Sequence, residues 1–369
     1  MGVRSVDAKD VIKERERKPH PEVDEELRKI LESKRAEIKV IGVGGAGGNT
    51  ISRMVQVGII GAEMLAMNTD AQDLLYTDAD TKVLIGRELT GGLGSGADPK
   101  TGAEAAKESK EDIKKAIEGA DLVFVTCGLG GGTGTGAAPV IADIAKKNGA
   151  LTVGVVTLPF TMEGRQRARN AQEGLENLQA VADTIIIIPN DKLLEIVPDV
   201  SITTAFKVAD EILVNAVKGV TELVTKPGLV NLDFADVRAV MGAGGVAMIG
   251  MGESDTDNRA IESVEKSLNN PLLDVDIEGA TGALINVCGG EDITIKECQE
   301  IVEAVTTKLN PDAKIIWGAQ IVKELGDTIR SMLIITGVKT PHLYGPSEKK
   351  ITNAKQKEIE RVLGIDFVE

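Results

Sequence analysis

Two glycine-rich segments hold the residues best suited to bind a ligand through the protein backbone. "GVGGAGGN" at 42–49 and "CGLGGGTGTGAAP" at 127–139 each follow an apolar run and lead into a helical pattern. Helix N-termini expose unpaired N–H groups and a positive dipole end, and glycines let phosphate oxygens approach that backbone. Thr133 and Thr135 add hydroxyl groups without positive charge. Two such loops favour a ligand with a long polyphosphate chain.

The first loop also allows a different ligand. Gly42 to Gly47 reads G-x-G-x-x-G, and Asp70 lies near the end of the next apolar run, a combination typical of dinucleotide sites. An NAD-dependent oxidoreductase is therefore the alternative function. A P-loop is excluded, because the residues after Gly47 lack the lysine of that motif. A third segment, "TGGLGSGADP" at 90–99, suits either a cover for a terminal phosphate or an ordinary loop.

Two carboxylates far along the chain could act on water. Asp233 and Asp236 are spaced i, i+3, so they share one face and could orient and polarise an attacking water molecule. The simpler interpretation is that Asp233 caps a helix and Asp236 complements the helix dipole. They follow a helical pattern at 203–226 that would span roughly 36 Å. Across that distance they could reach only the ligand of a second molecule stacked head to tail, and such stacking builds filaments.

The elements that must position these residues follow from the alternation of apolar runs. From Glu37, short β-branched runs alternate with helical patterns, as in a parallel sheet covered on both faces. We predict an α/β fold with a Rossmann-like parallel-sheet domain, a long central helix and a second, smaller α/β domain. Carboxyl ends of parallel strands meet at one edge, so the two glycine-rich loops should converge. The expected strands are 37–43, 62–68, 82–85, 121–127, 151–157, 184–190, 245–252, 282–290, 314–321 and 328–338, and the expected helices are 48–57, 101–118, 135–148, 163–181, 203–226, 257–268 and 294–308.

The same patterns divide the chain into five parts. We expect a charged, mobile N-terminal arm at 1–36, a nucleotide-binding domain at 37–202, a connecting helix at 203–228, a C-terminal α/β domain at 229–338 and a polar tail at 339–369. The formal net charge of -15 excludes nucleic acid as a partner. No apolar run approaches the roughly 20 residues of a membrane span, and the three cysteines have no metal-ligand spacing. We therefore expect a soluble, cytoplasmic protein without direct membrane insertion.

Several segments resemble one family in the same order along the chain. "GGGTGTG" at 130–136 is similar to the signature loop of the tubulin/FtsZ superfamily. Matching segments are "GVGGAGGN", "NTDAQ" at 68–72, "GLGSGADP" at 92–99, "VVTLPFTMEG" at 155–164, "IPNDKLL" at 188–194 and "GLVNLDFADVRAVM" at 228–241. The resemblance covers roughly 37–338 and is closer to FtsZ than to eukaryotic tubulin. It implies a GTP-hydrolysing cell-division protein that polymerises head to tail into filaments of a mid-cell ring, with Mg²⁺ accompanying GTP or GDP.

The resemblance also implies a role for each matching residue. Asn190 and Asp210 would read the guanine base with Phe206 against its ring, Glu163 and Arg167 would contact the ribose region, and Asp233 and Asp236 would be catalytic. The residues alone favour an exposed ion pair for Glu163 and Arg167, and they allow Asn190 to be a turn residue and Asp210 a solvated helix charge. The remaining nucleotide-binding residues would be Gly44, Gly45, Ala46, Gly47, Gly48, Asn49, Asn68, Asp70, Ala71, Gly96, Ala97, Gly130, Gly131, Gly132, Thr133, Gly134 and Thr135.

No protein ligands for the metal can be named from the sequence. Asp98 stands where many relatives carry Asn, and it would add a negative charge near the terminal phosphate. The end of the tail, "IERVLGIDFVE" at 359–369, is either a frayed terminus or a docking segment for a membrane-tether or division-regulator protein.

Overall fold

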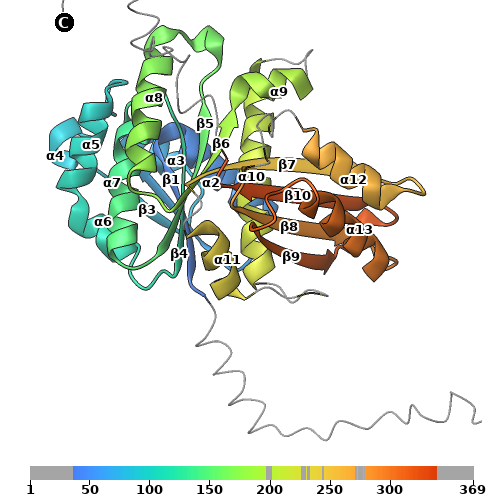
Figure 1. Ribbon diagram of the computed structural model, residues 1–369. Coiled ribbons are helices and arrows are strands. Elements are labelled where there is room, and N and C mark those ends of the chain that lie inside the picture. The colour runs from blue at the N-terminus through green and yellow to red at the C-terminus, as the bar shows by residue number, and fades with distance from the viewer. Residues whose placement is uncertain are drawn as a thin grey trace, which may run out of the picture. The chain divides into compact units, whose positions relative to one another are not determined.

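The computed structural model describes residues 36–196, 202–225, 230, 233–242, 245–270, 272, 277 and 279–338. The described residues belong to one compact unit (Figure 1). The expected arm before residue 36 and the tail after residue 338 lie outside the described residues.

One sheet runs through the whole described chain. Its strand order is β3-β2-β1-β4-β5-β6-β7-β10-β8-β9. Strands from β3 to β7 pair in parallel, β10 runs antiparallel to β7 and β8, and β8 pairs in parallel with β9. The strands are β1 (Ile38–Val43), β2 (Glu63–Asn68), β3 (Thr81–Leu84), β4 (Leu122–Gly128), β5 (Leu151–Leu158), β6 (Thr184–Pro189), β7 (Gly245–Ser254), β8 (Gly282–Gly289), β9 (Lys314–Ile321) and β10 (Ile329–Thr336). The predicted α/β fold class is confirmed.

Helices cover both faces of this sheet, as the continuous apolar strands predict. Within β4, Val123 and Val125 belong to one apolar cluster, while Leu122 and Phe124 belong to the other. The first cluster contains side chains of α5 (Pro99–Glu108), α6 (Lys110–Ala116), α7 (Thr133–Lys147), α8 (Arg165–Gln179), α12 (Arg259–Leu268) and α13 (Ile295–Thr306). The second contains side chains of α2 (Gly44–Val57), α9 (Asn190–Ile196), α10 (Ile202–Thr225) and α11 (Phe234–Met241). Successive side chains of one strand therefore pack into two buried layers, one on each face of the sheet.

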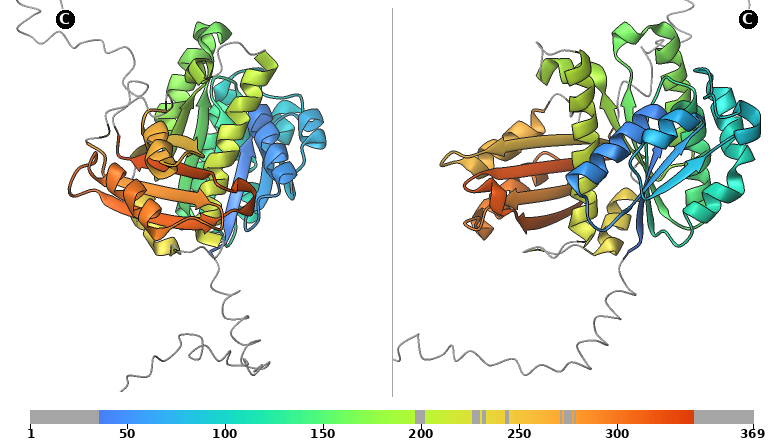
Figure 2. Two further views of the ribbon diagram at one scale, coloured as in Figure 1. Left: turned by 90° about the vertical axis from the view of Figure 1, so that its right-hand side faces the viewer. Right: turned by 180° about the vertical axis from the view of Figure 1, so that it is seen from behind.

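The long helix α10 stands between strands β1–β6 and strands β7–β10 (Figures 1 and 2). It is 24 residues long and buries apolar side chains over much of its circumference. The sheet nevertheless continues past it, because β7 pairs with β6 from Thr184 to Ile186. The predicted domain limits at 202 and 228 stay predictions, and one hydrogen-bonded sheet connects the two predicted α/β domains.

Several local elements differ from the expected ones. The expected helix 101–118 is two helices, because Ser109 leaves the helical conformation and its hydroxyl accepts a hydrogen bond from Gly86 N (2.9 Å). Helix α2 begins at Gly44 rather than at residue 48. The short helices α3 (Ala71–Tyr76) and α4 (Arg87–Thr90) were not expected, since neither is long enough to show a helical period.

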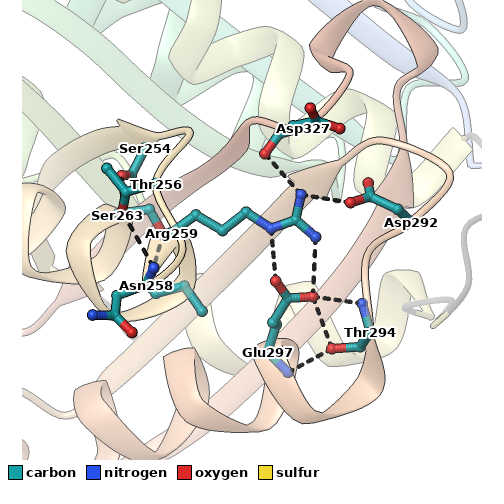
Figure 3. A network of polar contacts seen from close by, with 10 residues as sticks. Ser254, Thr256, Asn258, Arg259, Ser263, Asp292, Thr294, Glu297 and Asp327 are labelled. Carbon is teal, nitrogen blue, oxygen red and sulfur yellow. Dashed lines mark hydrogen bonds and ion pairs between the residues drawn. The ribbon is translucent and has the colours of Figure 1, made fainter.

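A network of charged side chains connects helices α12 and α13 (Figure 3). Arg259 at the start of α12 pairs with Glu297 of α13 (Nε to Oε1, 2.7 Å) and with Asp292 (2.7 Å), and it donates to the carbonyl oxygen of Asp327. Its side chain is 12% exposed. Burial raises the pKa of Glu297, but hydrogen bonds from Arg259 and Thr294 outweigh that effect and leave the pKa below its usual range.

We expect Arg259→Ala to lower the free energy of unfolding by about 2–4 kcal/mol, because it leaves a partly buried carboxylate and carbonyl without their donor. Urea denaturation measures the change. The matched control is Arg330→Ala, which breaks the more exposed pair with Glu253 and should cost less than about 1 kcal/mol. The pKa of Glu297 is depressed in the folded protein. The pair of Arg259 and Glu297 therefore contributes to the free energy of unfolding above the usual pKa of 4.5, and this contribution is lost as pH falls through the folded-state pKa. Equal losses in the two variants would contradict this assignment.

Candidate functional site

A cavity of about 620 Å³ opens at the carboxyl edge of strands β1, β2, β4 and β5. Its walls come from the three glycine-rich segments, from the start of α10 and from the residues around Glu163. The lining residues are Val43, Gly44, Gly45, Ala46, Asn68, Asp70, Asp73, Leu93, Gly94, Ser95, Gly96, Ala97, Gly128, Leu129, Gly131, Gly132, Thr133, Gly134, Thr157, Pro159, Glu163, Arg167, Asn190, Phe206, Ala209, Asp210 and Leu213. The predicted convergence of the glycine-rich loops is therefore present in the structure.

Close backbone approach explains why these loops need glycine. A Cβ added at Gly47 would lie 2.7 Å from the carbonyl oxygen of Thr126, and one at Gly44 would lie 3.0 Å from Gly134 N. Gly44 also has φ +71°, a conformation that glycine adopts without strain. Neither α2 nor α7 has a side-chain N-cap hydrogen bond. Their first N–H groups are thus left for a ligand, which is the arrangement that binds phosphate at helix N-termini.

The hydroxyl of Thr133 connects the second and third glycine-rich segments with the residue that follows β2. Its Oγ1 lies 2.6 Å from Thr69 Oγ1 and 2.9 Å from Ser95 Oγ, and the side chain is buried. Thr135 acts differently, because its Oγ1 accepts from Gly130 N (2.9 Å) and the residue does not line the cavity. Asn170 Nδ2 donates to the Gly130 carbonyl oxygen (3.3 Å). One threonine thus faces the ligand space while the other fixes the shape of the loop.

The far end of the cavity carries polar groups suited to a heterocyclic base. Asn190 is buried, and its Oδ1 has no hydrogen-bond partner among the described residues. Asp210 accepts from Thr50 Oγ1 at 3.0 Å. Burial raises the pKa of Asp210, and the hydrogen bond from Thr50 lowers it in part. Phe206 is 43% exposed and meets Phe160 edge to face, with ring centroids 5.3 Å apart.

Glu163 and Arg167 form the ion pair that their spacing allows, and both also line the cavity. The other oxygen of Glu163, Oε1, accepts from Phe160 N at 2.8 Å. The glutamate is therefore fixed at both oxygens, and it holds the arginine beside the ligand space. The ion-pair interpretation and the ligand-contact interpretation are compatible.

Some predicted residues do not line the cavity. These are Gly47, Gly48, Asn49, Ala71, Gly130 and Thr135. Asp98 does not line it either, because its carboxylate caps α5 by accepting from Lys100 N and Thr101 N. Hydrogen bonds from Thr101 and Lys100 lower the pKa of Asp98.

Asp73 lines the cavity although the sequence analysis did not select it. Its Oδ2 accepts from Asn68 Nδ2 at 2.6 Å, which orients the Asn68 amide. Ser95 and Gly94 were missed as individual residues, although both belong to the third glycine-rich segment. The available signal was the position of Asp73 directly after "NTDAQ".

The carboxylates of Asp233 and Asp236 lie at the opposite edge of the sheet. They form a capping box at α11, in which Ala235 N donates to Asp233 Oδ1 (3.1 Å) and Asp233 N to Asp236 Oδ2 (3.4 Å). Arg238 of the same helix donates to the carbonyl oxygen of Asp121, just before β4. The cavity takes Gly128 from the other end of β4, and a seven-residue strand spans roughly 23 Å. Both aspartates are exposed, and the capping bonds use one oxygen of each.

Among the described residues, no group of three or more His, Cys, Asp or Glu side chains could hold a metal ion. In the same part of the chain, every helix is too short or too polar to cross a membrane.

A parallel sheet with glycine-rich phosphate loops at its carboxyl edge and a long helix behind them defines a nucleotide-binding α/β protein. Residues 37–198 match the tubulin/FtsZ family, GTPase domain, and residues 245–339 match the FtsZ family, C-terminal domain. The class is therefore that of tubulin-like GTPases, and the NAD-dependent oxidoreductase alternative is not supported. The chain belongs to the FtsZ family of cell division proteins.

Three relatives illustrate the similarity. Cell division protein FtsZ 1 of Thermococcus kodakarensis is 63% identical over 89% of this chain and 88% of its own length. An FtsZ from M. jannaschii, solved as an empty dimer, is 60% identical with a TM-score of 0.82, over 86% of this chain and 93% of that one. CetZ1 from Haloferax volcanii, solved as a GDP-bound monomer, is 25% identical with a TM-score of 0.74, over 87% and 99% of the two chains.

Proposed function

We propose that this protein binds GTP in the cavity, stacks head to tail into filaments of the cell-division ring, and hydrolyses GTP at each junction between subunits. One observation carries the proposal. The cavity and the exposed pair Asp233 and Asp236 occupy opposite edges of one sheet, roughly a strand length apart. A translational repeat along the strands brings the aspartates of one subunit over the cavity of the next. The empty dimer from M. jannaschii supports self-association.

The donor and acceptor groups of the cavity fit a guanine nucleotide. The free N–H groups at the starts of α2 and α7 suit a polyphosphate. Asp210 can accept from the N1–H and N2–H donors of guanine, and the unpartnered Asn190 Oδ1 needs a partner in this buried position. The GDP bound to CetZ1 supports the same ligand class.

Catalysis would divide between the two subunits. The helix N-termini of one subunit would stabilise negative charge on the phosphates, and the neighbouring subunit's Asp233 and Asp236 would orient and polarise the attacking water. Mg²⁺ would accompany the triphosphate and neutralise charge there. We propose no protein ligand for it.

We also propose a cytoplasmic location at mid-cell and a partner for the tail. The apolar and acidic end of the tail, at 359–369, would dock on a membrane-tether or division-regulator protein. This segment lies outside the described residues, so the proposal rests on its composition.

We expect GTP turnover per subunit to rise cooperatively with protein concentration, because a complete site needs two subunits. Turnover and sedimentation should be measured across one concentration series in GTP, with GDP and NADH as comparisons. Turnover and pelleting should begin at the same concentration in GTP, and NADH should support neither. Turnover strictly proportional to protein from the lowest concentrations would contradict the shared site.

A further inference from the structure

A second cavity, of about 550 Å³, lies on the face of the sheet away from α10. One stripe of α7 forms its floor, and α5 and α8 form its walls. Its apolar lining includes Ala103, Pro139, Val140, Ile144 and Val181. From Thr135 to Ile144 the floor extends about 13 Å along the helix axis. We call it the α5–α7–α8 groove.

The groove has one basic wall. Lys100, Lys107 and Lys110 line it from α5 and the start of α6. Lys107 and Lys110 are exposed, and neither forms a salt bridge with an acidic side chain of the described chain. On the opposite wall, Glu173 of α8 is exposed, and on the floor Asp143 of α7 is paired with Lys147. An apolar segment that carries acidic residues on one side and a basic residue on the other would complement these walls.

The described chain ends close to this groove. Val338 N donates to the carbonyl oxygen of Val246, and the preceding Gly245 bonds through its N–H to the Asp183 carbonyl oxygen. From β10 to β6 there are two strand spacings, about 10 Å in all. Asp183 follows directly after Val181 and Ala182, and Val338 and Val181 pack in the same apolar cluster. Val338, the last described residue, therefore lies about two strand spacings from Asp183, which follows the Val181 end of the groove.

The tail contains a segment with the matching chemistry. "RVLGIDFVE" at 361–369 has five large apolar side chains, two acidic residues at 366 and 369, and a basic residue at 361. The residues between 338 and 362 can span up to about 80 Å, far more than the distance needed. We propose that residues 361–369 dock in the α5–α7–α8 groove of their own chain. Phe367 and Ile365 would then lie on α7, the acids would face Lys107 and Lys110, and Arg361 would face Glu173.

This contact would withhold the segment from any other partner. The floor of the α5–α7–α8 groove begins at Thr135 and Gly136, which directly follow the loop that lines the nucleotide cavity. Docking is independent of whether the cavity binds GTP, so failure of one proposal leaves the other standing.

Competition on the full chain tests the docking. A fluorescent peptide of residues 358–369 is titrated with the wild-type chain and with the full-length Ile365→Asp/Phe367→Asp variant, whose own tail is disabled. We expect the variant to bind the peptide at least fivefold more tightly than the wild type, because the wild-type groove is already occupied. Fluorescence anisotropy at low protein concentration gives both affinities, and circular dichroism confirms equal folding.

Matched charge reversals locate the binding surface. In the tail-disabled chain, Lys107→Glu/Lys110→Glu should weaken peptide binding about tenfold, and high salt should remove most of that difference. Lys114→Glu/Lys115→Glu changes the net charge equally on exposed residues of neighbouring α6 and should leave affinity within twofold. Equal peptide affinity of the wild-type and tail-disabled chains, or equal losses from the two charge reversals, would overturn the proposal. If the wild-type chain excluded the peptide more strongly as protein concentration rose, the groove would be occupied by the tail of a second copy. That result would also overturn the proposal.

Discussion

Asp236→Asn should lower GTP turnover at least 100-fold while leaving the dissociation constant for GTP within threefold. The physical reason is distance. Asp236 lies at the edge of the sheet opposite the cavity, so its charge contributes nothing to nucleotide binding within its own subunit. If its carboxylate polarises water at the neighbouring subunit's nucleotide, losing that charge removes an effect that is typically worth 10²–10⁴ in rate. Steady-state phosphate release and equilibrium binding of fluorescent GTP separate the two quantities.

The capping box requires its own control, because a lost cap also lowers stability. Asn caps a helix about as well as Asp, so Asp236→Asn and Asp233→Asn change charge with little effect on α11. Thr294→Ala removes the N-cap of α13, a comparable capping box elsewhere in the chain. This control should cost about 1 kcal/mol of stability and leave turnover nearly unchanged. Equal turnover of wild type and Asp236→Asn would leave the aspartates as caps alone, and the filament as a non-catalytic structure.

Mixing subunits then tests whether the site is shared. Asp236→Asn subunits have an intact cavity, and subunits with Asp210→Lys have an intact Asp236 but a disabled base site. Random assembly would place a working cavity under a working aspartate at roughly a quarter of the junctions, so the mixture should recover turnover that neither variant has alone. If the mixture were as inactive as each variant alone, the cavity and the Asp236 that serves it would belong to the same subunit.

The sequence predicted the sheet well because its strands are buried on both faces. Runs such as Leu122–Gly128 admit few other structures, and the glycines after them end the strands at one edge. The sequence did not predict that β7 would pair with β6, or that β10 would lie between β7 and β8. Such pairings join segments far apart in the chain, and the local pattern carries no information about which strand edges meet.

The candidate site was predictable to the level of loops rather than of atoms. The glycine pattern located one end of the cavity, yet it could not separate Gly44, which lines the cavity, from Gly47, which makes room for the Thr126 carbonyl oxygen. Asn190 was expected at the end of a strand, and it is the first residue of α9. Which side of a loop or helix faces the ligand depends on packing against distant elements. Only the assembled structure supplies that information.

Asp210→Asn should change which nucleotide the cavity prefers. In the wild type, the ionised carboxylate would accept from both N1–H and N2–H of guanine. The amide of the Asp210→Asn variant would offer one acceptor, and its NH₂ group would face a guanine N–H donor. We therefore expect about 100-fold weaker GTP binding, equivalent to about 2.7 kcal/mol. Xanthine carries a carbonyl where guanine carries its amino group, and the new amide can donate to it. XTP should therefore bind the variant more tightly than GTP does, whereas ATP, which lacks the N1–H donor, should stay weak in both proteins.

The neighbouring residue provides the control, and pH provides a second readout. Glu211 is partly exposed and pairs with Arg53 outside the cavity, so Glu211→Gln should leave nucleotide preference unchanged. Burial raises the pKa of Asp210, and only an ionised carboxylate could accept from both guanine donors. Wild-type GTP affinity should thus fall as pH drops through a value above the usual 3.8 of aspartic acid, and Asp210→Asn should lack that fall. Thr50→Val removes the hydrogen bond that lowers this pKa, so it should move the fall to higher pH. If Asp210→Asn kept the wild-type preference for GTP over XTP, Asp210 would be a helix charge beside the cavity, and base recognition would rest on Asn190.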